Sequence, residues 1–262
     1  MLIDTLVHEK LLDLFYLYLI IGGIPAVVEA YLKTKNLHEV FQIQEGIIKL
    51  YKKDIAQYDP KNKLYLEEIF QLIPSELNCK NKRFIWLKEA GVALPVYCAS
   101  EPTLPLILSR STNLFKLFMS DVGLLSSMYA DGIQVKLLKK ETNINYGSVY
   151  ENAAAQELWA HGFDLYYFNS KKQGEIDFLI EQNGEVLPIE IKSGKGYTKH
   201  SALDNLLNSE HYHIEKAFVF CNENVKQEGK IIYYPIYMCG FLQKQKVDRQ
   251  MIYDMDLSVL QS

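Results

Sequence analysis

Three acidic residues and one lysine have types and spacings that suit the binding of a divalent cation: Glu175, Asp177, Glu190 and Lys192. Alternate residues of a β-strand lie on the same face, so each neighbouring pair points to one side of its strand if both stretches are extended. Carboxylates that face each other across a sheet repel, and a cation between them removes that cost. Mg²⁺ suits such a position, because it binds through one or two carboxylates and keeps water or phosphate oxygens as its other ligands.

The dipeptide Asn183-Gly184 would bring these side chains together. It favours a type I′ turn between two strands, because both central residues of that turn need a positive φ. The register set by a two-residue turn places Asp177 opposite Glu190. The same register places Glu175 opposite Lys192.

Two alternatives remain open from the pattern alone. The polar residues could form a solvated sheet face, on which Glu175 and Lys192 make a surface ion pair that contributes little to stability. Pro188 lacks a main-chain N–H, so a bulge or an edge position there could shift the register by one residue.

Length, composition and charge bound the kind of protein. The chain has 262 residues, enough for two or three small domains, and 48% of them are hydrophobic, enough for real cores. A net charge of −4 excludes a global basic field, so any nucleic-acid binding must come from a local patch. The four cysteines form no Cys-x-x-Cys pair, which excludes zinc-finger spacing and favours free thiols: Cys79, Cys98, Cys221 and Cys239.

The most apolar stretch of the chain runs from Leu14 to Ile21. It is too short to span a bilayer and lacks the basic region and cleavage site of a signal peptide. We interpret it as a buried helix and expect a cytoplasmic protein with no membrane partner.

The first half of the chain divides into two expected units. Residues 1–60 have the apolar spacing of helices, and residues 61–137 suggest a small winged-helix domain, with helices before a strand at 92–98 and a return strand at 106–108. Several basic residues near this second unit could contact phosphates. We prefer scattered surface charge, because aromatic residues do not alternate with them: Lys80, Lys82, Arg83, Lys88, Arg110 and Lys116.

Residues 138–262 favour a third unit, a mixed α/β domain with one central sheet. The expected order is a helix, three strands, a helix and two strands, at 148–161, 164–169, 175–181, 186–192, 201–207, 217–221 and 231–237. Ser201 is the expected N-cap of the second helix. His200, His211 and His213 lie close together in the sequence, and with a neighbouring acid such as Asp204 they could bind a metal. No His-x3-His or HExxH spacing supports this, and we prefer surface histidines.

A helix followed by strands bearing Asp177 and Glu190-Ile191-Lys192 resembles the PD-(D/E)XK nuclease superfamily. The resemblance implies that Asp177 and Glu190 hold Mg²⁺ and that Lys192 positions or activates the attacking water. It implies Glu151 as the supporting acid on the helix. Glu157 is the alternative, but it lies six residues later, about 240° around the helix, so only one of the two can face the site.

A longer series of motifs resembles the C-terminal half of a prokaryotic family of AAA-type ATPases, which carries a winged helix and a nuclease-like domain of unknown function. The resemblance implies that residues 1–60 are a remnant of the ATPase lid region. It covers about residues 15–240, with these motifs in order: Gly22-Gly23-Ile24-Pro25, Ile73-Pro74-Ser75, Phe115-Lys116-Leu117, Asp121-Val122-Gly123-Leu124-Leu125, Gly147 with Glu151-Asn152, Glu157-Leu158, Glu175-Ile176-Asp177-Phe178 and Ile189-Glu190-Ile191-Lys192-Ser193.

The chain departs from that family in two places. Around Gly194-Lys195, position 189 is Ile and position 196 is Gly, so both the phosphate-cradling glycine and the Mg²⁺-binding Ser/Thr of a Walker A motif are absent. We therefore expect no ATP site in this chain. The family usually has a further helix around Lys82 to Trp86, and this segment is too short to contain it. The resemblance therefore gives less support to DNA binding by the winged helix.

Two functions follow from these expectations. The first is a Mg²⁺-dependent DNA endonuclease that hydrolyses phosphodiesters at Asp177, Glu190 and Lys192, supported by Glu151. The second is a non-catalytic module of an AAA-type ATPase, which binds DNA or protein. The first function is favoured if the side chains of Asp177, Glu190 and Lys192 lie within about one metal-ligand shell and open to a cleft. The second is favoured if Lys192 is buried in a pair with Glu175.

Overall fold

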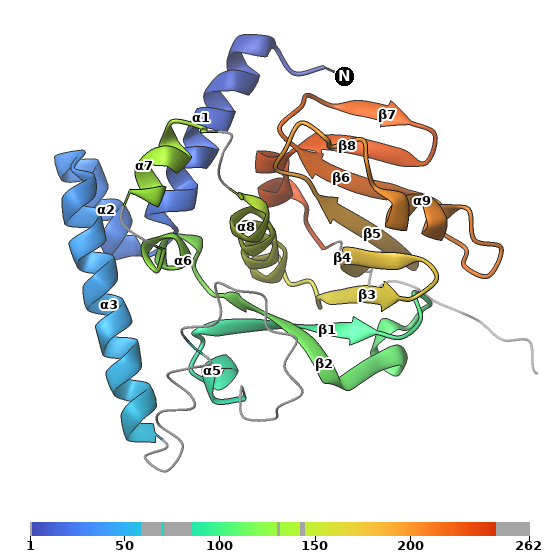
Figure 1. Cartoon of the computed structure of the whole chain (residues 1–262), viewed down its shortest axis with the longest axis horizontal. Coiled ribbons are helices and arrows are strands. Elements are labelled where there is room, and N and C mark those ends of the chain that lie inside the picture. Colours follow the sequence, from blue (N-terminus) through green and yellow to red (C-terminus); the bar gives the residue numbers. More distant parts are fainter. Residues whose placement is uncertain (1, 59–69, 71–84, 130–131, 142–144, 245–262) are drawn as a thin grey trace, which may run out of the picture.

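The computed structural model describes residues 2–58, 70, 85–129, 132–141 and 145–244. The fold is mixed α+β, with helices in the N-terminal half and a large mixed sheet in the C-terminal half (Figure 1). The expected fold class is therefore confirmed. Most of the segment before 85 in which helices were expected ahead of the strand at 92–98 lies outside the described residues.

One eight-stranded sheet runs through the described part of the chain, in the order β2-β1-β3-β4-β5-β6-β8-β7. Strands β1 and β3, β5 and β6, and β6 and β8 pair in parallel, and the other neighbours are antiparallel. The strands are β1 (Ala93–Ala99), β2 (Arg110–Met119), β3 (Tyr166–Ser170), β4 (Gly174–Gln182), β5 (Glu185–Ile191), β6 (Ala217–Cys221), β7 (Lys226–Glu228) and β8 (Ile231–Pro235).

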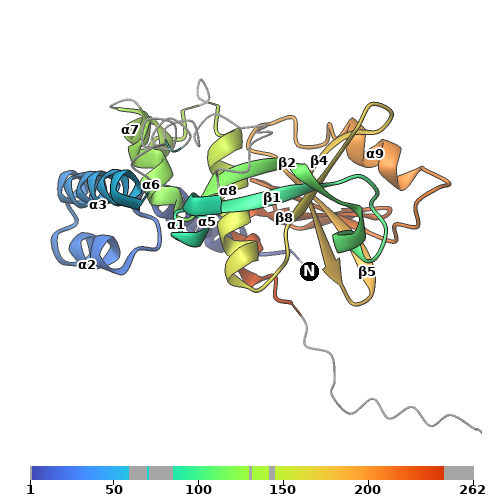
Figure 2. The ribbon, with the colours of Figure 1, turned by 90° about the horizontal axis from the view of Figure 1, so that it is seen from below.

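Helices cover both faces of this sheet. Apolar residues of α1 and α8 pack on one face, and Leu203 and Leu206 of α9 pack on the other. Figure 2 shows α8 between the sheet and the N-terminal helices. The helices are α1 (Thr5–Ile21), α2 (Pro25–Thr34), α3 (Leu37–Tyr58), α5 (Ile85–Glu89), α6 (Val122–Ser127), α7 (Ile133–Leu138), α8 (Gly147–Ala160) and α9 (Ser201–Leu207), with 3₁₀ turns η2 (Leu106–Ser109) and η3 (Ile236–Phe241).

The break between α1 and α2 is fixed by a close approach to α6. Gly22 has a φ of +73° and closes α1, and a side chain on Gly123 of α6 would meet the Ile21 carbonyl oxygen at 2.5 Å. Asp121 caps α6 through Leu124 N, at 2.9 Å, and also accepts from Gly23 N, at 2.7 Å. These small residues therefore allow α1 and α6 to pack against each other.

The sheet does not stop at the expected boundary between residues 137 and 138. Strand β1 pairs in parallel with β3, with Tyr97 opposite Tyr166, so the strands of the middle segment belong to the same sheet as those of the last one. The described strands of the middle segment, β1 and β2, therefore form no sheet of their own. The expected return strand at 106–108 was also wrong, because these residues form η2, where Leu106 N donates to the Glu181 carboxylate.

Of the basic residues named for the middle segment, the three that the structure describes do not form one surface patch. Lys88 and Arg110 both lie over the ring of Tyr97, whereas Lys116 is only 5% exposed. Scattered surface charge was thus the wrong interpretation for Lys116. The other three lie outside the described residues: Lys80, Lys82 and Arg83.

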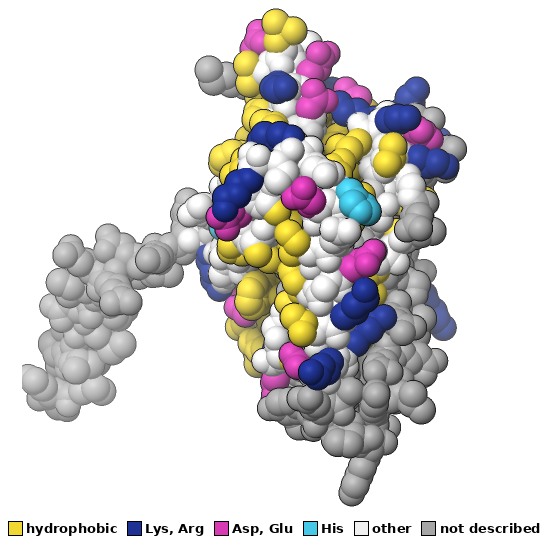
Figure 3. All heavy atoms as spheres, turned by 90° about the vertical axis from the view of Figure 1, so that its left-hand side faces the viewer, with side chains coloured by type: hydrophobic (Ala, Val, Ile, Leu, Met, Phe, Trp, Pro, Cys, Tyr) yellow, Lys and Arg dark blue, Asp and Glu magenta, His cyan; other side chains and the backbone are white. Residues whose placement is uncertain are grey.

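The face that carries α2 and α3 mixes hydrophobic side chains with charges of both signs (Figure 3). No single helix among the described residues has both the length and the hydropathy of a membrane span. Helices α1 and α2 meet both criteria only when they are taken together, and they are bent by 119° relative to each other. Three of the four cysteines are described, and all three are buried free thiols, as expected: Cys98, Cys221 and Cys239.

Candidate functional site

The expected hairpin turn is present at Asn183-Gly184. Both residues have a positive φ, +54° and +75°, as a type I′ turn requires. Strands β4 and β5 pair in the predicted register from Gln182 opposite Glu185 to Phe178 opposite Ile189. Pro188 does not shift this register.

Beyond Phe178 the two strands part, so the expected strand-to-strand partners were wrong. The pairing of β4 with β5 ends at Phe178 opposite Ile189, so neither Glu175 nor Lys192 has a partner across the hairpin. On the outer sides of the hairpin, Glu175 lies opposite Asn169 of β3, and Lys192 N–H donates to the Phe220 carbonyl of β6 at 2.8 Å. Asp177 and Glu190 are therefore not opposed in the ladder.

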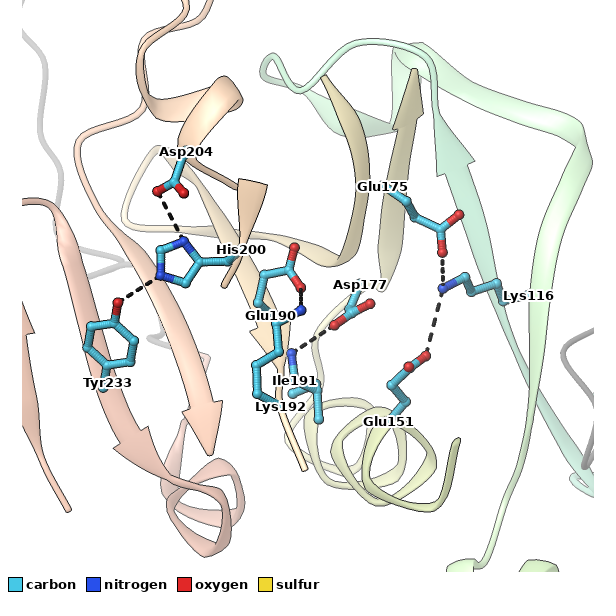
Figure 4. A network of polar contacts seen from close by, with 10 residues as sticks. All are labelled: Lys116, Glu151, Glu175, Asp177, Glu190, Ile191, Lys192, His200, Asp204 and Tyr233. Atoms are coloured by element: carbon cyan, nitrogen blue, oxygen red, sulfur yellow. Dashed lines mark hydrogen bonds and ion pairs between the residues drawn. The ribbon is translucent and has the colours of Figure 1, made fainter. Parts of the chain in front are cut away.

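A bulge in β4 explains where Asp177 goes. Between β3 and β4 the register shifts, with Tyr166 opposite Leu179 but Phe168 opposite Ile176, which leaves β4 with one extra residue at this point. Bulges commonly re-aim a side chain. Here the Asp177 Oδ2 atom accepts a hydrogen bond from Ile191 N at 2.8 Å, across the gap between β4 and β5 (Figure 4).

Glu190 is the most buried acid of the site, with 3% of its surface exposed. Its Oε2 atom lies 3.0 Å from Lys192 Nζ. Burial, and then the nearby Asp177 carboxylate, raise the pKa of Glu190 to about 8, although Lys192 opposes this shift. The structure therefore places two carboxylates together in a position where both can be ionised only at a cost.

Lys192 is half-buried and pairs with Glu190, not with Glu175. Burial by itself would lower its pKa, but the charges of Glu190 and Asp177 raise the pKa above the ordinary value. Lys192 is consequently a cation at neutral pH.

Lys116 of β2 also belongs to this site, although its sequence position did not indicate this. Its Nζ atom lies 2.6 Å from Glu175 Oε1 and 3.7 Å from Glu151 Oε2 (Figure 4). Burial would lower its pKa, but Glu151, Asp177 and Glu175 raise the pKa well above the ordinary value. The sequence feature that could have indicated a buried lysine here is its position as the only charged residue in the apolar stretch from Leu114 to Met119.

Helix α8 presents Glu151 to this cluster and not Glu157. Glu157 instead accepts a hydrogen bond from Tyr18 OH of α1 at 2.5 Å. The next helical residue after Glu151 is also fixed, because Asn152 exchanges hydrogen bonds with the main chain of Met119 in β2. These contacts hold the first turns of α8 against the strand that carries Lys116.

Together these residues form a polar cluster of two carboxylate–lysine groups. Asp177, Glu190 and Lys192 make one, and Glu151, Glu175 and Lys116 make the other. Within the described ranges no three His, Cys, Asp or Glu side chains are grouped closely enough to hold a metal by themselves. Asp177 and Glu190 thus suit a cation that takes two carboxylates and keeps waters, as Mg²⁺ does.

His200 is separate from this cluster and is not a surface residue. Its Nδ1 atom lies 3.0 Å from Asp204 Oδ1, and its Nε2 atom lies 2.7 Å from Tyr233 OH. His200 also occupies the N-cap position of α9, and Ser201 is the first helical residue, which corrects the expected cap. This network joins α9 to β8.

Two family models match parts of the chain. Residues 12–85 match a domain of unknown function, DUF8612, and residues 146–239 match another domain of unknown function, DUF4143. The second match contains Glu151, Asp177, Glu190 and Lys192, whereas Lys116 lies outside both. No curated protein and no solved structure gave a significant match.

Proposed function

We propose that the chain is a Mg²⁺-dependent phosphodiesterase of the PD-(D/E)XK type that cuts DNA. The observation that supports this most directly is the buried Glu190 carboxylate beside Asp177, with the Lys192 ammonium 3.0 Å from Glu190. Such a carboxylate pair costs free energy without a cation and is relieved by one. The order of these residues along a helix and two strands is the same as in the nuclease motif.

Asp177 and Glu190 would hold the metal. The metal would supply electrostatic stabilisation of phosphate charge and a bound water of lowered pKa. Lys192 keeps its proton at neutral pH, so its part is to orient water and stabilise developing negative charge rather than to remove a proton. Lys116 offsets one of the two charges of Glu151 and Glu175 and thereby reduces the repulsion between this second acidic pair and a phosphate.

The second candidate is a non-catalytic module that binds DNA or protein, attached to or working with an AAA-type ATPase. One observation favours it: Lys192 already has a partner in Glu190, so the cluster is internally neutralised in part. In that case the polar residues serve to specify the fold. The ordered motifs support the ATPase association in both cases.

A plasmid-nicking assay with Mg²⁺ or Mn²⁺ tests the nuclease. We expect nicking by the intact chain, loss of it in Asp177→Ala and in Glu190→Gln, and retention in Asp164→Ala, a matched control whose acid is 81% exposed. Cleavage that survives Asp177→Ala would overturn the assignment. Absence of cleavage, combined with no Mg²⁺-dependent rise in melting temperature, would favour the non-catalytic module.

A further inference from the structure

A cleft of about 520 Å³ opens beyond the carboxyl ends of β5 and β6. This volume lies in the range of small-molecule and cofactor sites, roughly 300–1,000 Å³. Its walls are partly polar and partly aromatic, and include Tyr16, Lys140, Tyr146, Ser193, Lys195 and Asn222. In sheets with parallel strands, ligands bind in crevices outside the carboxyl ends of the strands.

The cleft adjoins the carboxylate cluster through two segments. Ser193 directly follows Lys192, and Tyr146 directly precedes α8, which carries Glu151 just over one turn further along. A chain-like ligand with one unit at Asp177 and Glu190 would therefore have its next unit within reach of this cleft.

Asn222 fixes one wall of the cleft. Its Oδ1 atom accepts from Tyr150 OH at 3.0 Å, and its Nδ2 atom donates to Ser193 O and to Tyr16 OH, both at 3.4 Å. Its main-chain oxygen accepts from His8 Nε2 at 3.0 Å. The wall is thus held by α1, α8 and the end of β5 before any ligand binds.

The two lysines of the cleft differ in availability. Lys140 lies 2.5 Å from Asp13 Oδ1 and over the ring of Tyr16, so its charge is already compensated. Lys195 is exposed, and no ion pair joins it to another residue in the described ranges. It stands between Gly194 and Gly196, where the open main chain allows a ligand to approach closely. Lys195 therefore offers a free ammonium to an anionic group of a ligand, and the Glu223 carboxylate of the same cleft can accept hydrogen bonds from a neutral part of that ligand.

We propose that this cleft binds one nucleotide unit of the strand whose phosphate lies at Asp177 and Glu190. Lys195 pairs with a backbone phosphate, and the Asn145 amide and the Glu223 carboxylate offer hydrogen bonds to a base or sugar. The inference rests on the proposed function, because it takes the neighbouring carboxylates as the place of the phosphate. A free nucleotide has the same chemistry, and the test separates the two sources.

The test measures binding without catalysis. The full chain is titrated against a fluorescent short oligothymidylate in EDTA, and its anisotropy is followed at several salt concentrations. We expect Lys195→Ala to weaken binding several-fold and to reduce the salt slope by about 0.7, the value for one phosphate contact on a single strand. Lys172→Ala is the matched control, since Lys172 is also an exposed loop lysine, and it should bind as the unsubstituted chain does.

Three outcomes overturn the proposal: no binding of the oligonucleotide, equal affinities of the Lys195→Ala and Lys172→Ala variants, or thymidine monophosphate that binds as tightly as the oligonucleotide. The last would indicate a free-nucleotide site. Because the metal is removed, the binding measured here does not depend on cleavage. A chain that binds through Lys195 but never cleaves would therefore retain the cleft and lose only the nuclease.

Discussion

The carboxylate of Asp177 takes the hydrogen bond that a strand would otherwise provide to Ile191. Its Oδ2 atom accepts from Ile191 N at 2.8 Å, where β4 and β5 have ceased to pair. Asp177 therefore has a structural task as well as its proposed metal-binding one. A substitution of Asp177 can therefore change both the stability of the fold and the binding of Mg²⁺, and the two effects have to be measured separately.

Asp177→Ala should destabilise the fold more than Asp177→Asn. Alanine leaves the Ile191 N–H without its acceptor, at a cost of about 1–3 kcal/mol, whereas asparagine keeps an amide oxygen there. Urea unfolding of both variants without metal measures the difference. Equal stabilities would show that the hydrogen bond contributes nothing. Both variants should lose Mg²⁺ binding, so the Asn variant separates function from folding.

Stability should fall as the pH rises from about 4.5 to about 8. The pKa of Glu190 is raised from 4.5 to about 8, so the native state holds a proton that the unfolded chain releases in this window. The stabilisation is complete below the unfolded pKa and is lost as the pH passes the folded pKa. It is on the order of a few kcal/mol. Urea midpoints across this pH range check the slope.

Glu190→Gln should flatten this slope and be more stable than the unsubstituted chain at pH 8. Glu185→Gln on the same strand is the control, because its side chain is 44% exposed, and it should keep the slope. Addition of Mg²⁺ at pH 8 should restore stability to the unsubstituted chain but not to Glu190→Gln. A pH profile that is the same for Glu190→Gln and the unsubstituted chain would contradict the buried acid pair.

Lys116→Met should be strongly destabilising. It leaves Glu151, whose side chain is 13% exposed, and Glu175 without their cation, and the loss of one partner of a buried ion pair costs about 3–5 kcal/mol. Lys49→Met breaks a pair whose side chains are 77% and 61% exposed, and should cost below about 0.5 kcal/mol. Thermal denaturation compares the two. Similar melting temperatures would show that Lys116 is not essential to the cluster.

Gly123→Ala and Gly46→Ala should have opposite effects. A Cβ atom on Gly123 would meet main-chain atoms of Ile21 and Gly22 at 2.5–2.6 Å, so α1 and α6 would have to separate. A Cβ atom on Gly46, inside α3, meets nothing within 4 Å, and alanine there favours the helix by about 1 kcal/mol. Guanidinium unfolding should show a loss for the first variant and a gain for the second.

Local patterns in the sequence were sufficient to predict much of the hairpin and of the elements around it. Asn183-Gly184 fixed the turn and the register as far as Phe178, and helix α9 and strand β6 have the expected bounds at 201–207 and 217–221. Each of these depends on residues close together in the chain. The period of apolar residues and the φ requirements of a tight turn are therefore enough to predict them.

What the sequence did not reveal depends on distant pairing. Lys116 reaches Glu175 only because β1 pairs in parallel with β3, and no local pattern at 93–99 or 166–170 signals that partnership. The bulge of β4 opposite Tyr167 likewise arises from how β4 pairs with its other neighbour, β3. Extension of the turn register past Phe178 therefore paired Asp177 with the wrong position.

The contacts of α1 have a consequence for the order in which the chain folds. Ile3 exchanges two hydrogen bonds with Asn224, 221 residues away, and His8 contacts Tyr237 of η3. The apolar residues of α1 pack on α6 and α8, whereas Asn224 and Tyr237 contact its N-terminal end. Contacts with such a large sequence separation form late in folding, so the first turn of α1 is expected to dock after the rest of the helix.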